Sequence, residues 1–256
     1  MNKPSDFNRL ARLYRWMEWA TFGPCLGWCR REYLTELSAC RHAVVLGDGD
    51  GRFTSRLLST NSLIQIDAVD ASSAMLRALV RRAGDQSARI RTHHADARSW
   101  RPAPTPENQP IDLITTHFFL DCLITSEVHS LATRLRRLES PSTLWLVSEF
   151  AIPPTWFGRL VARPLVSGLY LAFAWLTGLT VRTLPDHSAA LRQSGFCLQK
   201  QRTWLGGLLT SELWSSGVSH IVPNPALSQL NCYSRVNIEP HGAARPTSYP
   251  PADQSR

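Results

Sequence analysis

The sequence predicts an α/β fold with a doubly wound, mostly parallel sheet of seven strands, a Rossmann-like arrangement. Three observations predict it. Short apolar runs alternate with helical patterns from about residue 42 onward, a glycine-rich turn (Gly47–Gly51) follows the first apolar run, and Asp70 ends the second. Strands that alternate with helices form parallel sheets, because each crossover helix brings the chain back to the same edge.

Each strand is expected where an apolar run is short and bounded by polar or turn residues. The strands are expected at 43–46, 63–69, 89–93, 111–117, 143–149, 196–203 and 207–214. The last two follow a helix at 187–194, which Asp186 is expected to cap. Residues 101–110 carry four prolines, which predicts a surface loop.

The helices are expected where apolar residues recur every three or four positions. One helix is expected to bury Phe53, Leu57 and Leu58. The next begins after Ser72 as N-cap, with an apolar stripe of Met75, Leu76, Leu79 and Val80, and a later helix carries Val128, Leu131, Leu135 and Leu138. Residues 6–40 read as two helices broken at Gly23-Pro24, the second at about 26–37.

One apolar stretch tests whether the chain enters a membrane. Pro164 to Val181 holds no charge and is bounded by Arg163 and Arg182, a length near the lower limit for a spanning helix. Pro164 and two glycines interrupt it. We therefore expect a helix that is buried, covers the substrate or leans on a membrane, and not one that spans a bilayer.

Composition excludes several classes. The net charge is +8, and all but Lys3 and Lys200 of the 28 basic residues are arginines. They are scattered without a basic–aromatic module, so no nucleic-acid partner is expected. Six cysteines show no CxxC pair, so no metal site is expected and the thiols suit a reducing cytoplasm. We expect a cytoplasmic protein and leave peripheral membrane contact open.

The glycine turn indicates the type of ligand. In doubly wound sheets, ligands bind at the carboxyl ends of the strands. The dinucleotide pattern GxGxxG is absent, because Arg52 or Thr54 stands where the third glycine would be. Asp48 and Asp50 would repel a pyrophosphate and attract a ligand with a sulfonium and an ammonium group. Asp70 suits a pair of ribose hydroxyls.

The segments AVVLGDGDGRF, AVDASSAML, HHADARSW, IDLITTHFFLDCL and LWLVSEF resemble, in order, the motifs of class I S-adenosylmethionine-dependent methyltransferases. The resemblance covers about residues 42–214. EFAIPP, LPDHSAALRQSGF and GGLL are more loosely similar to the ubiquinone/menaquinone-biosynthesis C-methyltransferase branch. The resemblance implies an N-terminal helical lid at 1–40 and a methyltransferase domain at 41–236, with an apolar helical insertion at about 155–181 after strand five. We expect a disordered tail at 237–256.

The resemblance also implies roles for single residues. S-adenosyl-L-methionine is the implied cofactor, with Gly47, Gly49 and Gly51 beside its methionine part and Asp70 on its ribose. The remaining implied contacts are Ala71 and Met75 at the adenine, Asp96 and Ala97 at the adenine amine, Thr116 facing the methyl donor, and Tyr14 in the lid. One position departs from the family: Val45 stands where an acidic residue is usual, and Asp48 is expected to replace it.

The acceptor side is less defined. His117 and Asp121 follow the fourth strand, and we expect His117 to be the base if the acceptor must lose a proton, with Asp121 as the alternative. Phe118 and Phe119 favour a small lipophilic or aromatic acceptor. Two other functions stay open: a protein that binds S-adenosylmethionine without transferring a methyl group, and a nicotinamide-dependent oxidoreductase. The sequence does not determine the oligomeric state or whether carbon, oxygen or nitrogen is methylated.

Overall fold

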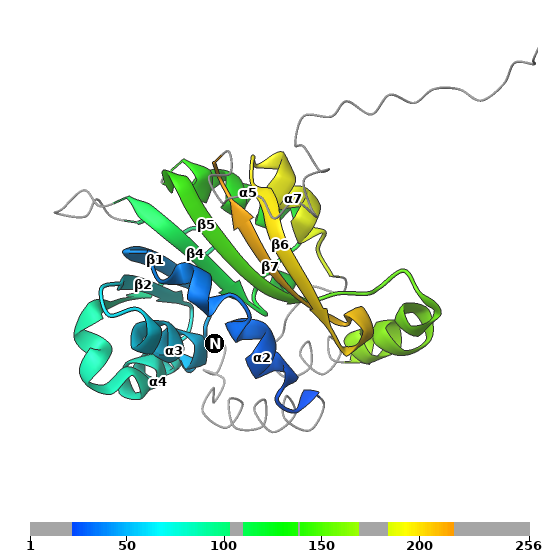
Figure 1. Cartoon of the computed structure of the whole chain (residues 1–256), viewed down its shortest axis with the longest axis horizontal. Helices are drawn as coiled ribbons and strands as arrows, with labels where there is room; N and C mark the ends of the chain where they lie inside the picture. The colour runs from blue at the N-terminus through cyan, green and yellow to red at the C-terminus, as the bar shows by residue number, and fades with distance from the viewer. Residues whose placement is uncertain (1–21, 103–109, 138, 169–183, 218–256) are drawn as a thin grey trace, which may run out of the picture. The chain divides into compact units, whose positions relative to one another are not determined.

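A computed structural model describes residues 22–102, 110–137, 139–168 and 184–217, which form a seven-stranded sheet of order β3-β2-β1-β4-β5-β7-β6 (Figure 1). Neighbouring strands are parallel except that β7 runs antiparallel to both β5 and β6. The predicted fold class is therefore confirmed. The strands are β1 His42–Leu46, β2 Gln65–Asp70, β3 Ile90–His94, β4 Ile111–His117, β5 Glu139–Phe150, β6 Cys197–Trp204 and β7 Leu209–Ser215.

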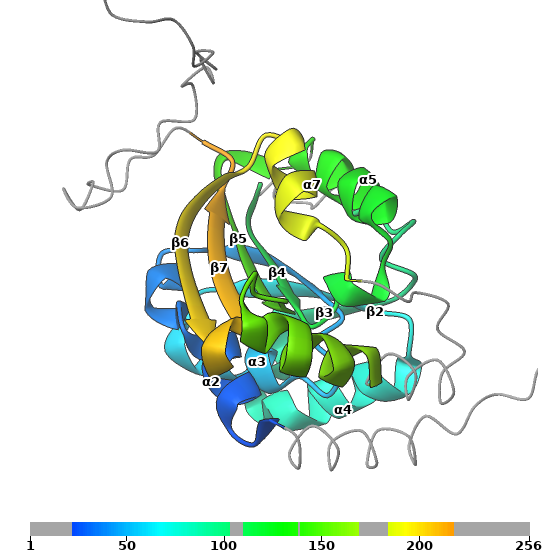
Figure 2. The ribbon, with the colours of Figure 1, turned by 90° about the vertical axis from the view of Figure 1, so that its right-hand side faces the viewer.

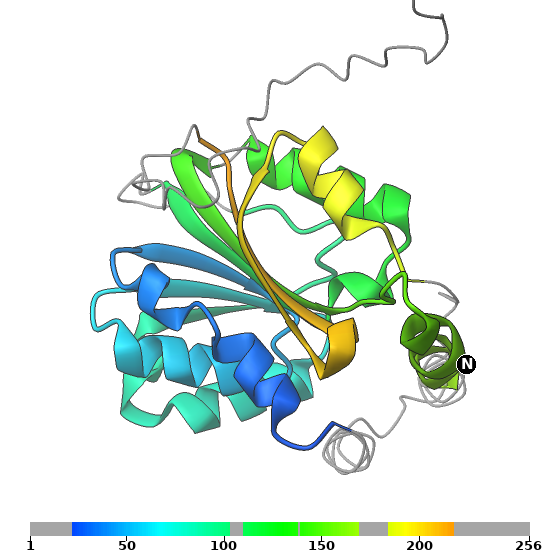
Figure 3. The ribbon, with the colours of Figure 1, turned by 45° about the vertical axis from the view of Figure 1, so that its right-hand side comes forward.

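Helices cover both faces of the sheet (Figures 2 and 3). One face carries α2 Cys25–Arg31, α3 Arg52–Thr60 and α4 Ser73–Ala83, and the other carries α5 Thr125–Arg136 and α7 His187–Gln193. Shorter helical turns are η1 Leu34–Leu37, η2 Gly84–Arg89, η3 Leu120–Cys122, η4 Gly158–Ala162 and η5 Leu205–Gly207. This is the layer arrangement that a sheet with two apolar faces requires.

Alternating side chains of the central strands form two apolar cores. Ile114 and Trp145 pack with Leu131 beneath α5 and α7, whereas Leu113 and Leu146 belong to the core that α3 and α4 cover. Burying each side chain of this size contributes roughly 1.5–3 kcal/mol. The stripe predicted for α4 is wrong at Val80, which is 37% exposed. Its place is taken by Ala83, which lies one turn beyond Leu79 on the buried side.

The helix boundaries confirm the predicted caps and correct one predicted helix. The Ser72 hydroxyl accepts the backbone N–H of Met75 at 3.3 Å, and the Asp186 carboxylate accepts that of Ala189 at 2.9 Å. The helix expected at about 26–37 is interrupted: α2 ends at Arg31, and η1 follows. Tyr33 leaves the helical conformation (φ −114°, ψ 26°), and its side chain is buried in the α3–α4 core.

Residues 156–168 form a helix that contains the π-helical turn η4. Gly158 packs directly on the Pro153 carbonyl, where any side chain would overlap it. Within the described ranges, no helix combines the length and the apolar character needed to cross a membrane. The predictions for Tyr14, the 103–109 loop, residues 169–181 and the tail 237–256 lie outside the described residues.

Candidate functional site

The predicted cofactor residues lie at one edge of the sheet. Leu46 at the end of β1 pairs with Val69 in β2 and with Thr116 in β4, and Asp70 pairs with His94 at the end of β3. The carboxyl ends of four parallel strands therefore meet here. This edge brings together the Gly47–Gly51 loop, Asp70 and the segment that follows β3.

The Gly47–Gly51 loop is packed at both ends and open in the middle. Gly47, Gly49 and Gly51 all have positive φ (66°, 57° and 79°). A Cβ on Gly47 would overlap the Phe119 ring, and a Cβ on Gly51 would lie 2.8 Å from the Cα of Leu79. At Gly49, no atom of the described residues lies within 4 Å of that position. The loop thus exposes its backbone to a ligand only at its centre.

Asp48 is turned away from this opening. Its Oδ2 accepts the Thr54 backbone N–H at 2.8 Å and the Thr54 hydroxyl at 2.7 Å, and its Oδ1 accepts the Phe53 N–H at 3.3 Å. Burial raises the pKa of Asp48, whereas the hydrogen bonds from Thr54 and the nearby charge of Arg30 lower it. The carboxylate thus caps α3. Its expected role in place of an acid at Val45, itself 1% exposed, remains a prediction.

Asp70 is well placed for a polar ligand. Its carboxylate accepts the N–H of Ser72 at 2.7 Å. Burial and then the neighbouring Asp48 raise its pKa, while hydrogen bonds from Ser72 and Gly49 lower it. Ala71 follows it and is exposed, and its carbonyl lies 3.0 Å from Nε2 of His94. Met75 is half-buried in the first turn of α4.

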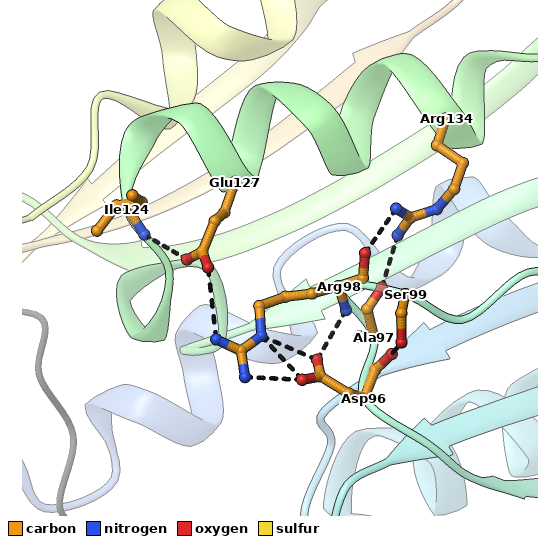
Figure 4. Close-up of polar contacts among 7 residues, drawn as sticks. All are labelled: Asp96, Ala97, Arg98, Ser99, Ile124, Glu127 and Arg134. Carbon is orange, nitrogen blue, oxygen red and sulfur yellow. Dashed lines mark hydrogen bonds and ion pairs between the residues drawn. The ribbon is translucent and has the colours of Figure 1, made fainter.

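Asp96 lies two residues beyond β3 and is tied to an arginine (Figure 4). The guanidinium of Arg98 donates from Nε and Nη2 to its carboxylate at 2.7–3.0 Å, which lowers the pKa of Asp96. Arg98 also reaches Glu127 of α5 at 3.4 Å, and Arg134 of that helix donates to the carbonyls of Ala97 and Arg98. The contacts of Arg98 with Glu127 and of Arg134 with the two carbonyls attach the loop after β3 to α5. Ala97 itself is buried in the core.

Thr116 and His117 are buried in the sheet. The Thr116 hydroxyl accepts the indole N–H of Trp145 at 3.0 Å. The His117 ring lies 4.1 Å from the Phe53 ring, its Nδ1 is 2.9 Å from the Ser148 hydroxyl, and its Nε2 is buried without a hydrogen-bond partner among the described residues. Burial, and then the charge of Arg30, hold its pKa well below 6.5. The imidazole is therefore neutral.

Asp121 and Glu149 form a pair of interacting acids at the ends of β4 and β5. Asp121 is half-buried in η3, and burial raises its pKa to about 6. Glu149 is 1% exposed: its Oε1 accepts the N–H groups of Phe119 and Leu120 at 3.0 and 2.7 Å, and its Oε2 is buried without a partner among the described residues. Burial, and then the charge of Asp121, raise the pKa of Glu149 well above its usual value.

Glu149 was not among the predicted site residues. The signal was an acidic residue at the end of the apolar run LWLVS, the same pattern that identified Asp70. Through hydrogen bonds from two backbone N–H groups, Glu149 holds the turn after β4. This turn includes Phe118 at φ 53°, and the ring of Phe119 packs against Gly47. It thereby supports the glycine loop from the neighbouring strand.

Comparisons with known proteins agree with this geometry. A family model described as a methyltransferase domain matches residues 43–142. No curated protein sequence matches the chain. Among solved structures, the fold is similar to that of the mitomycin 7-O-methyltransferase MmcR, with 15% sequence identity and a TM-score of 0.56 over 78% of this chain and 60% of that one.

Two further structures give the same result. The S-adenosylmethionine-dependent methyltransferase SibL is 17% identical with a TM-score of 0.54, covering 74% of this chain and 55% of its own. The N-methyltransferase NodS from Bradyrhizobium japonicum is 12% identical with a TM-score of 0.52, covering 75% and 97%. The chain thus spans less than two thirds of MmcR and SibL. At these identities the neighbours establish the fold.

The residues present fit the cofactor of this fold. The Asp70 carboxylate offers acceptors for ribose hydroxyls. The exposed backbone at Gly49 allows the close approach of a methionine moiety. The order of the strands, the position of the glycine loop and the matched domain agree with one another. Residues 43–142 thus match a methyltransferase domain, and the fold is that of S-adenosylmethionine-dependent methyltransferases, whose cofactor is S-adenosylmethionine.

Proposed function

We propose that the chain transfers a methyl group from S-adenosylmethionine to a small lipophilic or aromatic acceptor. The observation that carries this proposal is the open backbone at Gly49 beside the Asp70 carboxylate, at the edge where β1 and β2 end. MmcR and NodS are named as O- and N-methyltransferases, so the fold serves more than one acceptor atom. The looser similarity to the quinone-biosynthesis branch remains a prediction.

The chain's own residues bind and orient. The bound cofactor supplies an electrophilic methyl group on a sulfonium. Asp70 accepts hydrogen bonds from the ribose hydroxyls, and Ser72 keeps its carboxylate in position. Asp96, held by Arg98, borders the adenine side. Because displacement at a methyl group with a good leaving group needs little covalent help, positioning contributes most of the rate.

If the acceptor must lose a proton, the surroundings favour Asp121 over His117 as the base. A base must reach its proton and titrate near the working pH. Asp121 is half-buried with a pKa raised to about 6, which burial causes. His117 is 4% exposed, packed on Phe53 and held against Ser148. His117 is therefore proposed to shape the floor of the site.

An apolar acceptor suits the side chains that follow β4 and β5. The Phe118 ring lies 5.1 Å from that of Phe150, which lies 5.3 Å from that of Phe22. This aromatic group packs with Leu208 and Leu209 in a separate small core. An apolar wall beside a few polar groups is the common composition of a small-molecule site.

Cofactor binding tests the first half of the proposal. Asp70→Ala removes two charge-assisted hydrogen bonds, which costs on the order of 2–4 kcal/mol, so calorimetry should show S-adenosylmethionine binding weakened by about 30-fold to several hundred-fold. Asp85→Ala, an exposed acid in η2, is the matched control and should bind normally. Unchanged affinity in Asp70→Ala would refute the assigned role.

Catalysis separates the proposal from its alternative, a protein that binds the cofactor without transfer. One observation favours the alternative. The Asp48 carboxylate accepts hydrogen bonds at the start of α3, and Val45 stands where the family usually has an acid, so fewer carboxylates are available to bind the ammonium group of the cofactor. Single-turnover transfer to a panel of phenols, quinols and amines distinguishes the two. Transfer whose rate falls about 10²–10⁴-fold in Asp121→Asn supports Asp121 as the base. The control is Asp85→Asn, which removes the charge of an exposed acid in η2 outside the site.

We also propose that the chain contacts a membrane at its periphery through the helix at 156–168. Trp156 and Leu160 are 73% and 72% exposed, Val161 is 42% exposed, and Arg159 and Arg163 lie between and beside them. Exposed tryptophan and leucine together with arginine are typical of segments that lie in the interface of a bilayer. Such contact brings the site to lipophilic acceptors.

Vesicle sedimentation tests this contact. Wild-type protein should sediment with phosphatidylcholine–phosphatidylglycerol vesicles, and Trp156→Ser/Leu160→Ser should remain in solution. The control is Leu63→Ser, which removes another exposed leucine, 61% exposed, from a different surface. Equal sedimentation of all three proteins would refute the proposal. Protein that resists an alkaline carbonate wash would instead indicate an integral segment.

A further inference from the structure

Arg98 occupies the carboxylate that is proposed to border the adenine of the cofactor (Figure 4). Oδ1 of Asp96 accepts the backbone N–H of Arg98 at 2.9 Å and its Nε–H at 3.0 Å, and Oδ2 accepts the Nε–H at 2.9 Å and the Nη2–H at 2.7 Å. The two oxygens of a carboxylate offer about four acceptor positions between them, so this one arginine fills them. The amino group of an adenine therefore binds Asp96 only where it replaces one of these contacts.

A second carboxylate lies within reach of the same guanidinium. Oε1 of Glu127 in α5 is 3.4 Å from Nη1 of Arg98, a longer distance than any of the arginine's contacts with Asp96. The other oxygen of Glu127, Oε2, accepts the backbone N–H of Ile124 at 3.0 Å, which fixes this side chain at the start of the helix. The guanidinium thus lies between two carboxylates and is bound closely to one and loosely to the other.

The backbone of Arg98 is fixed, whereas its side chain is accessible to solvent. Arg134 of α5 donates to the carbonyls of Ala97 and Arg98 at 2.6 and 2.7 Å, which attaches this part of the loop to the helix. The side chains of Arg98 and Asp96 are 54% and 43% exposed. Exposed side chains change rotamer within nanoseconds, and an ion pair this exposed is weak. A shift of the guanidinium from Asp96 toward Glu127 is therefore both fast and small in free energy.

We propose that Arg98 is a latch on the adenine subsite, which holds Asp96 in the free protein and moves to Glu127 when the cofactor binds. The adenine amino group then donates to the Asp96 oxygen that the guanidinium leaves. The latch lowers cofactor affinity, because binding must break contacts between Arg98 and Asp96. It also favours a base with an amino group, since only a hydrogen-bond donor replaces the contact that Asp96 loses. This inference rests on the role proposed for Asp96 in cofactor binding.

Calorimetry of the full-length protein with S-adenosylhomocysteine, the demethylated form of the cofactor, tests the latch. Arg98→Gln should bind this ligand about two- to fivefold more tightly than wild type, the range that an exposed ion pair sets. The matched control is Arg81→Gln, which removes the same charge from an exposed position on α4 and should bind as wild type does. Glu127→Gln keeps an acceptor for the Ile124 N–H and should bind more weakly than wild type, because the displaced guanidinium loses its second carboxylate.

Two comparisons separate the latch from a general effect of charge. In an Asp96→Asn background, Arg98→Gln should give no gain in affinity. An analogue of S-adenosylhomocysteine whose purine lacks the amino group should bind Arg98→Gln no better than wild type. The latch alone is overturned if Arg98→Gln fails to bind S-adenosylhomocysteine more tightly while Asp70→Ala still weakens binding, or if the analogue gains as much affinity. If wild type does not bind S-adenosylhomocysteine at all, the latch and the proposed function both fail.

Discussion

Alanine at two glycines of the same loop should rank in one order for the loss of stability and in the reverse order for the loss of cofactor binding. Gly51 and Gly49 both have positive φ, 79° and 57°. A Cβ on Gly51 would lie 2.8 Å from the Leu79 Cα and 2.9 Å from its Cβ, whereas a Cβ on Gly49 meets no atom within 4 Å in the part of the chain that the structure describes. The two exchanges thus share the backbone penalty and differ in what the methyl group contacts.

The magnitudes follow from that difference. A left-handed conformation costs a residue other than glycine about 1–2 kcal/mol. Gly51→Ala adds an overlap with the backbone of α4, which cannot move aside as a side-chain end can, worth about 1–3 kcal/mol. We therefore expect Gly51→Ala to lose about 2–5 kcal/mol, a fall of roughly 5–15 °C in melting temperature, and Gly49→Ala to lose about 1–2 kcal/mol.

Binding should show the reverse order. The methyl group of Gly49→Ala projects into the opening where the cofactor backbone contact is proposed, so S-adenosylmethionine affinity should fall more than tenfold. Gly51→Ala, measured well below its melting temperature, should bind much closer to wild type. Thermal unfolding by circular dichroism and calorimetric titration measure the two quantities. The reasoning fails if both variants lose the same stability, or if Gly49→Ala binds the cofactor normally.

Three further outcomes are expected. Asp67 is 3% exposed and accepts hydrogen bonds from His42 and His93. Burial raises its pKa, but these hydrogen bonds lower it by more, so Asp67→Ala should cost about 3 kcal/mol of unfolding free energy at neutral pH. The difference between wild type and variant in urea unfolding should disappear as pH falls below about 4. Burial and the charge of Asp121 raise the pKa of Glu149, so Glu149→Gln should remove the decline in stability that wild type shows as pH rises above the usual pKa of a glutamate. Glu149→Ala, which leaves two N–H groups without an acceptor, should cost about 2–4 kcal/mol and more than Glu149→Gln; equal losses would contradict this. His117→Asn should leave the shape of the pH–rate profile near neutrality unchanged, because a buried imidazole with a lowered pKa is already neutral there; loss of the acidic limb would restore His117 as the base.

The sequence by itself determined the class of fold, the order of the elements and the edge of the sheet at which the proposed cofactor residues gather. Strand β4 begins and ends at the predicted residues, and the Ser72 and Asp186 caps form as expected. These features are local. An apolar run of fixed period, a glycine turn and a capping side chain depend on residues within a few positions of one another, so a reader of the sequence has all the information that they need.

Only the tertiary structure decided where the polar side chains point. Asp48 caps α3, the Thr116 hydroxyl binds Trp145, and Glu149 supports a turn that lies on a neighbouring strand. Arg30 of α2 and Arg82 of α4 line one cavity, although they lie 52 positions apart in the sequence. The physical reason is that hydrogen bonding, burial and charge act over a few ångströms in space, and the residues that meet at those distances are brought together by the packing of helices on the sheet, whatever their separation along the chain.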